Sequence, residues 1–377
     1  MSNIFDYIHW RGDLDFEREP FNPVDGIVFS QLSYLPFDGI VTGPYSSTEF
    51  SIRIVASMFN EKLIHSRSSL EHDILFKEDP ALLDAMAASE RYGSCRLCAF
   101  VNNHDINREV QFSAVSVLAG EKSPVIVYRG TDLSLVGWKE DFNMSFSETI
   151  PAQLEAVKYL EKIAQRLKGP LRICGHSKGG NLAIFAASHC SKHIRKRITD
   201  IYSYDAPGFH EKVITSEGFV EIRDRIHSYV PQASVVGMLL EHNTDYKVVK
   251  SEQTGLLQHE MYSWDVIHND MVRLDSVTLG SRFVDKTLRE WLDSLNKEQR
   301  EKFFETLYAI LSATEAKSLT DLESSWFMAA GRMIKSLRNV DDSTRTFIRK
   351  ALADLLRSAR QNIHTLLPDN KKRINGH

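Results

Sequence analysis

The chain of 377 residues carries 46 basic and 50 acidic side chains, a formal net charge of −4 at pH 7, and 42% of it is hydrophobic. This composition is typical of a globular protein with one large or two smaller domains, and the net charge excludes nucleic-acid binding through bulk charge. The sequence begins without a basic segment followed by an apolar core, and it has no apolar run of the about 20 residues that a membrane span needs. We therefore expect a cytoplasmic protein without a nucleic-acid partner.

Cysteine and histidine spacing does not predict a metal site. Cys95 and Cys98 form a C-x-x-C, but no second such pair completes a zinc site, and residues three apart on the strand expected here face opposite sides. His189 and His193 are four apart on an expected helix and would share one of its faces, but no Glu lies between them and no third ligand is evident. Phosphate-binding glycine motifs are also missing, so we expect no metal, nucleotide or other cofactor.

Residues 1–93 are predicted to be helices and loops that pack on the core. Apolar residues recur at helical spacing in 24–37 and 48–61. The segment 79–93 starts at a proline and ends at a glycine, as short helices do.

From residue 94 onward, short apolar strands alternate with helices. We expect helices over 151–169 and 180–190, and strands over 96–105, 109–120, 124–130, 171–174, 198–205, 225–230 and 246–251. Strands and helices that alternate through short connections form a largely parallel sheet. Residues 94–282 are therefore predicted to be an α/β core, a mostly parallel sheet flanked by helices.

Residues 283–377 are predicted to be a helical C-terminal subdomain, with helices over 282–295, 297–313, 324–337 and 343–360. From Ser343 onward, eight Lys and Arg against two Asp give a local charge of +6. The last helix has an apolar face with basic residues around it. It either packs on the body with a solvated basic face or makes weak contact with a membrane surface.

One G-x-S-x-G stands in the chain, from Gly175 to Gly179, with Ser177 at its centre. A strand precedes it and a helix follows it, as in a nucleophile elbow, where a serine is exposed on a tight strand-to-helix turn. The helix N-terminus favours a developing anion beside this serine. The alternative is a glycine turn without chemistry.

A serine nucleophile needs a base, and the base needs an acid that orients it. In this type of fold the chain order is Ser, then Asp or Glu, then His. Asp205 ends the next strand and is the first choice for the acid, although it could also be a turn-forming Asp. His259 lies in a loop after the strand 246–251 and is the first choice for the base, with His268 second. Weaker rivals for the acid are Asp224, Asp245 and Asp265.

The oxyanion formed in acyl transfer needs two backbone N–H donors. One is the residue after the nucleophile, here Lys178, and the other follows an earlier strand, here Thr131.

Two blocks of sequence resemble the class 3 (fungal-type) lipase family of α/β-hydrolases. Its aromatic-Arg-Gly-Ser/Thr stretch, followed by Trp and Asp, is matched at Arg129, Gly130, Thr131, Trp138 and Asp141. Its G-H-S-x-G-G is matched from Gly175 to Gly180. The resemblance covers roughly residues 25–270. It implies an α/β-hydrolase fold, Ser177 as nucleophile, and Thr131 and Lys178 as the oxyanion hole.

The chain departs from that family at the acid. Class 3 lipases usually carry Asp-x-Val-Pro after a later strand, where "SYVPQASVVGMLL" here has no Asp. Asp205 lies where lipases of the pancreatic type have their acid. "GHSKGGNLA", "YDAPGF", "YVPQASVVGMLLEH" and "QHEMYSW" are still more similar to a bacterial family of uncharacterised α/β-hydrolase-like proteins.

The sequence thus predicts a lipase- or esterase-like serine hydrolase that cleaves a carboxylic ester with Ser177, His259 and Asp205. Two alternatives stay open. One is a hydrolase-fold protein that binds an acyl ligand or a partner without turnover, and the other is an acyltransferase. Segment 132–146 lies where class 3 lipases carry their lid.

Overall fold

The computed structural model describes residues 2–65, 73–105, 107–108, 110–120, 124–131, 140, 144, 147–234, 236–238, 240, 245–296, 298–300, 302–303, 306 and 342–363. Trp138 and Asp141 of the lipase-like motif lie outside the described residues, as do most of the helix predicted over 297–313 and all of the one predicted over 324–337.

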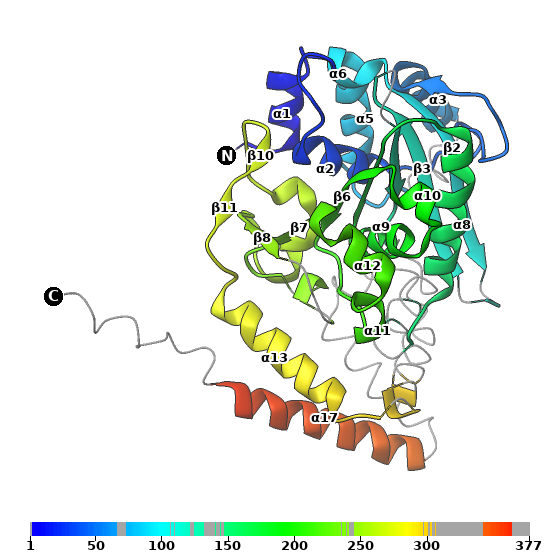
Figure 1. Ribbon diagram of the computed structural model, residues 1–377. Helices are drawn as coiled ribbons and strands as arrows, with labels where there is room; N and C mark the ends of the chain where they lie inside the picture. The colour runs from blue at the N-terminus through cyan, green and yellow to red at the C-terminus, as the bar shows by residue number, and fades with distance from the viewer. Residues whose placement is uncertain are drawn as a thin grey trace.

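Nine strands of the described chain form one sheet in the order β1-β2-β3-β4-β5-β6-β7-β8-β11 (Figure 1). They are β1 (Phe50–Ser51), β2 (Arg96–Asp105), β3 (Val110–Leu118), β4 (Pro124–Tyr128), β5 (Leu171–His176), β6 (Ile198–Tyr204), β7 (Ile226–Pro231), β8 (Tyr246–Val249) and β11 (Arg273–Leu274). Strands β4 to β8 are parallel, and the pairs β1–β2, β2–β3, β3–β4 and β8–β11 are antiparallel. A separate hairpin joins β9 (Val266–Ile267) and β10 (Asp270–Met271).

Helices cover both faces of this sheet, because alternate residues of its strands point to opposite sides. In β4, Val125 and Val127 pack in one apolar core, and Ile126 and Tyr128 in the other. The first core holds α1 (Ile4–Arg11), α2 (Pro23–Leu32), α3 (Ile52–His65), α5 (Asp79–Ala88) and α6 (Glu90–Gly93). The second holds α8 (Pro151–Arg166), α9 (Lys178–His189), α10 (Lys192–Arg195), α11 (Glu211–Ile214) and α12 (Glu217–Ile222). The predicted fold class, a mostly parallel sheet flanked by helices, is confirmed.

Some local predictions were wrong. Residues 48–61 are not one helix, because Phe50 and Ser51 form β1 and pair with β2, so the N-terminal segment adds an edge strand to the sheet. His189 and His193 do not share a helix face, because α9 ends at His189 and α10 starts at Lys192. All four cysteines are buried free thiols.

A buried ion pair fixes the N-terminal helices to one another. Asp25 in the first turn of α2 accepts hydrogen bonds from Arg91 Nε at 2.7 Å, Arg91 Nη2 at 2.6 Å and the Tyr92 hydroxyl at 2.6 Å. Both charged side chains are fully buried. Removal of one partner would leave an uncompensated charge in the core.

We therefore expect Arg91→Ala to lower the free energy of unfolding by about 3–5 kcal/mol, as measured by urea denaturation. Arg53→Ala is the matched control, because the Arg53–Glu90 pair is 3.9 Å long and mostly exposed. That control should change the free energy of unfolding by about 0–1 kcal/mol. Equal effects of the two substitutions would contradict the role given to Arg91.

Two C-terminal helices, α13 (Leu279–Asp293) and α17 (Asp342–Asn362), pack together at one end of the molecule (Figure 1). Their shared apolar cluster includes Trp291 and Ile348, and Trp291 Nε1 donates to the carbonyl of Ala351 at 2.8 Å. The boundary predicted at 282/283 falls within α13, and the domain boundaries stay predictions.

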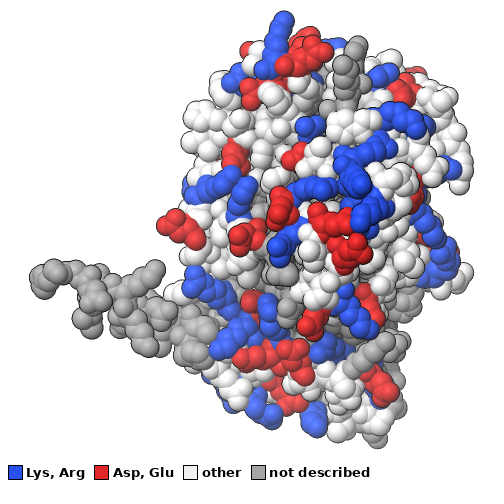
Figure 2. Space-filling model, viewed as in Figure 1, with Lys and Arg blue, Asp and Glu red and all other residues white. Residues whose placement is uncertain are grey.

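Basic and acidic side chains are interspersed over the face that Figure 2 shows. Arg349 and Lys350 on α17 are exposed, and the membrane contact predicted for this helix stays a prediction. In the part of the chain that the structure describes, no helix combines the length and the apolar composition needed to cross a membrane.

Candidate active site

Ser177 lies on the sharp turn between β5 and α9. Its φ of 57° and ψ of −132° are values that residues other than glycine rarely adopt. A Cβ on Gly175 would lie 2.3 Å from the backbone of Gly179, so these two glycines allow strand and helix to meet around the serine. Ser177 is half-buried, whereas its neighbours His176 and Lys178 are buried. The turn thus has the geometry predicted for a nucleophile elbow.

Asp205 directly follows the neighbouring parallel strand, β6. The N–H of Ser177 donates to the carbonyl of Tyr204 at 2.9 Å, which brings the serine next to the residue that precedes Asp205. Asp205 also has a positive φ, 44°, and its carboxylate is buried. The Oδ1 atom accepts hydrogen bonds from the N–H of Gly237 at 3.1 Å and from the hydroxyl of Ser234. These donors hold one carboxylate oxygen and leave Oδ2 for another partner.

That partner is His259. Its Nδ1 lies 2.6 Å from Asp205 Oδ2, and 28% of its side chain is exposed against 1% for Asp205. Because an ionised carboxylate only accepts hydrogen bonds, Nδ1 carries the proton and Nε2 keeps its lone pair. The predicted acid and base are therefore in contact, in the tautomer that a general base needs.

A second histidine holds the loop that carries the predicted base. His176 Nε2 lies 2.8 Å from the carbonyl oxygen of His259, and its Nδ1 lies 2.8 Å from the hydroxyl of Tyr34. Since a carbonyl only accepts, Nε2 is the donor, and the hydroxyl must donate to Nδ1. Burial lowers the pKa of His176 well below its usual range, which keeps the ring neutral and this pattern intact. No sequence pattern indicated these roles for Tyr34 and His176, because their partners are far away in the chain.

Three further contacts anchor the same loop, in which η3 (Gly255–His259) and η4 (Met261–Ser263) are short 3-10 helices. The side-chain oxygen of Gln258 accepts from the N–H of Ala233 at 2.7 Å, and the main-chain carbonyl of Gln258 accepts from Trp264 Nε1 at 2.8 Å. The hydroxyl of Tyr262 donates to Asp79 Oδ1 at 2.7 Å. The loop is therefore fixed on both sides of His259.

Asp79 makes this anchor dependent on pH. Its Oδ1 also accepts from Gln31 Nε2 at 2.8 Å, but its buried Oδ2 has no hydrogen-bond partner among the described residues. Burial raises the pKa of Asp79 from 3.8 to about 7. Because the folded pKa lies above the unfolded one, the folded state retains a proton that the unfolded state has lost. This contribution to stability is complete below about pH 4 and is lost as the pH rises to about 7.

Asp79→Asn should therefore make the protein more stable than the wild type at pH 8, with a difference that shrinks as the pH is lowered towards 5. The asparagine keeps an acceptor for Gln31 and Tyr262 but carries no charge to desolvate. Thermal unfolding midpoints measured from pH 5 to 8.5 test this. Asp84→Asn on the same helix is the control, because Asp84 is exposed. A constant difference across this pH range would contradict the argument.

The two predicted oxyanion donors lie in segments that contact the serine. A Cβ on Gly130 would lie 3.1 Å from the Cβ of Ser177, so the chain after β4 passes directly beside the elbow, and Thr131 comes next. Lys178 is the first residue of α9. The first N–H groups of an α-helix have no acceptor within the helix, which suits them to bind an anion.

The rival residues lie in other surroundings. His268 is exposed in the turn between β9 and β10, with its ring 6.0 Å from that of Trp10. Asp265 is paired with Lys250 Nζ at 2.6 Å. The other two rivals, Asp224 and Asp245, are exposed. Among the described residues, no three His, Cys, Asp or Glu side chains are grouped so that they could hold a metal ion.

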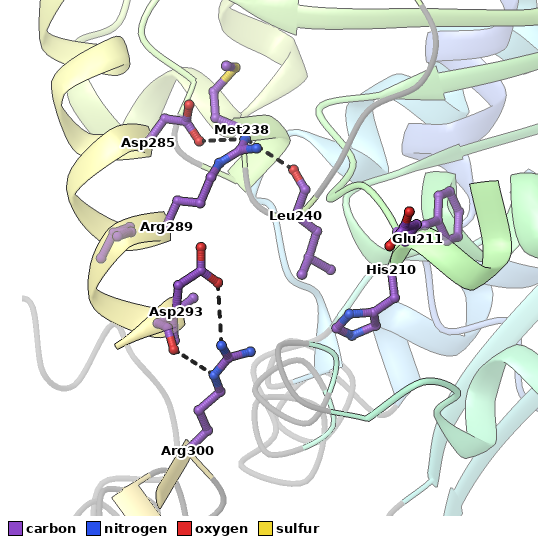
Figure 3. Close-up of a pocket in the computed structure, with 11 residues that line it drawn as sticks. His210, Glu211, Met238, Leu240, Asp285, Arg289, Asp293 and Arg300 are labelled. Atoms are coloured by element: carbon purple, nitrogen blue, oxygen red, sulfur yellow. Dashed lines mark hydrogen bonds and ion pairs between the residues drawn. The ribbon is translucent and has the colours of Figure 1, made fainter. Parts of the chain in front are cut away.

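A cavity of about 180 Å³ lies between α13 and the segment around Met238 (Figure 3). This segment also contains Ser234 and Gly237, which donate hydrogen bonds to Asp205. Met238, which follows Gly237 in the chain, lines the cavity together with Phe209 and Leu240. Arg289 and Arg300 also line it, and each is paired with an aspartate of α13. The cavity therefore combines apolar walls with compensated charges.

The sheet order, the helices on both faces and the strained serine at the carboxyl edge of the parallel strands define the α/β-hydrolase fold. The model of the Mbeg1-like family matches residues 86–309, more than half of the chain. The chain therefore belongs to the Mbeg1-like family. This membership and the fold support a relationship to lipase-like α/β-hydrolases.

Solved structures that match the chain include two lipases. M37 lipase is 14% identical, with a TM-score of 0.35, over 58% of this chain and 70% of its own. A deletion mutant of the Rhizomucor miehei lipase–propeptide complex is 12% identical, with a TM-score of 0.38, over 66% of this chain and 79% of its own. No curated protein matches the sequence.

Proposed function

We propose that this protein is a serine hydrolase that cleaves a carboxylic ester through an acyl-enzyme, without a cofactor. One observation carries the proposal: the contact of 2.6 Å between His259 Nδ1 and the buried carboxylate of Asp205. It lies at the same sheet edge as Ser177, which has a strained backbone and a half-buried side chain. A buried carboxylate that orients a partly exposed imidazole, at the sheet edge that also carries such a serine, has the parts of a catalytic triad.

In the first half-reaction, Ser177 Oγ attacks the acyl carbonyl carbon, and its proton moves to His259 Nε2. Asp205 then stabilises the imidazolium through Nδ1. The N–H groups of Thr131 and Lys178 bind the oxyanion. Collapse of the tetrahedral intermediate breaks the ester C–O bond, and the alcohol leaves with the proton from Nε2.

In the second half-reaction, His259 takes a proton from water, and the resulting hydroxide attacks the acyl-enzyme. The acid is released, and the proton returns to Ser177. If an alcohol or a thiol takes the place of water, the same residues catalyse acyl transfer. Product analysis with added acceptor distinguishes transfer from hydrolysis.

Labelling of the pure protein with a fluorophosphonate, followed by mass spectrometry to locate the adduct, tests the proposal. We expect rapid labelling at Ser177 in the wild type and its loss in His259→Ala, because the serine then has no base. His268→Ala is the matched control and should be labelled at the wild-type rate.

A wild-type protein that is not labelled would contradict the proposal and favour the alternative, binding of an acyl ligand or partner without turnover. Labelling that survives His259→Ala would retain the nucleophile and refute the base.

A further inference from the structure

The ammonium group of Lys178, the residue that follows Ser177, is buried. Its side chain is only 1% exposed, and Nζ lies 2.9 Å from Glu140 Oε2 and 3.0 Å from the carbonyl of Gln111. The ammonium also donates to the side-chain oxygen of Gln111. A buried cation needs such acceptors, because each proton has lost its hydrogen bond to water.

Glu140 connects the first turns of α8 and α9. Its side chain is fully buried. Its Oε1 accepts from the N–H of Ala152 in the first turn of α8 at 2.8 Å, and its Oε2 accepts from the N–H of Gln111 on β3 at 3.2 Å. Through Glu140, the side chain of Lys178 is tied to the start of α8 and to β3.

Helix stability does not account for a lysine at this place. A cation in the first turn of α9 is opposed by the helix macrodipole, and its burial carries a desolvation penalty. A protein in which apolar residues of similar size replace a buried ion pair is often as stable as the original. What the pair provides instead is a fixed position for the backbone of Lys178.

That position controls the peptide between Ser177 and Lys178. The ψ angle of Ser177, −132°, sets the direction in which the N–H of Lys178 points. A rotation about this angle would turn that N–H away from the proposed oxyanion. A strained conformation of this kind persists only where the surroundings hold it. The side chain of Lys178, anchored to Glu140, holds the far end of this peptide.

We infer that Lys178 and Glu140 are positioning residues for the oxyanion hole: their buried ion pair fixes the peptide that supplies the Lys178 N–H. This inference rests on the proposed function. Neither side chain touches the reacting atoms in this account. The side chain of Lys178 thus has a role in addition to that of its backbone N–H, and Glu140 has a role as its partner.

Three variants test it: Lys178→Met, Glu140→Gln and the double variant. The first measurement is the rate constant for fluorophosphonate labelling of Ser177, because the phosphoryl oxygen occupies the oxyanion hole. We expect each single variant to be slower by about ten- to a hundred-fold, since displaced groups and lost oxyanion donors have effects of this order. With an ester substrate, kcat should fall and KM should change little, because the oxyanion exists only in the transition state.

In the double variant, the two effects should not multiply, because either substitution alone removes the interaction. This variant leaves no unpaired charge in the core, so it keeps the test valid if a single variant does not fold. Lys192→Met is the matched control, because Lys192 on α10 forms an exposed ion pair at 3.2 Å with Glu221 on α12. The control should be labelled like the wild type.

The second measurement does not depend on activity. Hydrogen exchange of the peptide 174–182 should be faster in both single variants, because the first turn of α9 loses its anchor. A folded double variant that is labelled at the wild-type rate would overturn the inference, even if it unfolds at a lower temperature. If the wild type is not labelled, the proposed function fails, and unchanged exchange in this peptide would then overturn the positioning role by itself.

Discussion

Replacement of Ser177 by alanine is expected to lower kcat for ester hydrolysis by about 10⁴–10⁶-fold. In the proposed mechanism, the substitution removes the hydroxyl that forms the covalent intermediate, so only the proposed oxyanion donors and substrate binding remain. Alanine has a Cβ like serine, so the backbone at φ 57° is under the same strain in both proteins. Folding is therefore expected to be unaffected, and the effect should appear in turnover alone.

Steady-state hydrolysis of p-nitrophenyl esters by purified protein measures this effect. The control is Ser188→Ala in the last turn of the same helix, where the hydroxyl donates to the carbonyl of Phe185 at 2.9 Å. We expect the control to hydrolyse esters at the wild-type rate. Turnover by Ser177→Ala within tenfold of the wild type, with contaminating esterases removed, would refute the nucleophile.

Local sequence patterns predicted most of the sheet, because each of the strands β2 to β8 is a recognisable run of apolar or β-branched residues. The strand β5 begins with a short, mostly apolar run, 171–174, just before the glycines of the elbow, and its two sides meet different helical layers. The strand β1 has no such signal. It is two residues long and exists because Phe50 pairs with Leu97 across the edge of the sheet, so only the tertiary fold specifies it.

The same distinction applies to the candidate site. Ser177 and Asp205 each follow a strand directly, and parallel strands bring their carboxyl ends to one edge, so chain order alone predicted their neighbourhood. The loop histidine was predicted from its order after β8. These residues could be found because the topology of the sheet restricts where they lie.

The groups that hold these residues could not be found in this way. Ser234 and Gly237, which bind Asp205, come from the stretch where the resembling family carries its acid and this chain has none. Tyr34 reaches His176 across 142 positions, and Lys178 reaches Glu140 across 38. Hydrogen-bond partners so far apart are set by side-chain packing, which has no periodic signal in the sequence.

Asparagine in place of Asp205 is expected to lower kcat by about 10⁴-fold while leaving the fold intact. The reason lies in the two donors at Oδ1. The N–H of Gly237 and the hydroxyl of Ser234 point at that oxygen, so the new side chain must keep its carbonyl oxygen there. Its amide nitrogen then faces His259 Nδ1 and donates to it. The proton of the imidazole moves to Nε2, which can no longer accept the proton of Ser177.

The matched control for this substitution lies on the same strand. Asp200 pairs with His227 Nε2 at 3.2 Å near the start of β6, and both side chains are partly exposed. Asp200→Asn makes the same chemical change in a carboxylate–histidine pair away from the serine, and its kcat should equal that of the wild type. Circular dichroism and urea denaturation show whether each variant is folded. A folded Asp205→Asn protein with kcat within tenfold of the wild type would mean that the orientation of His259 does not limit the reaction, and the acid would have to be sought elsewhere.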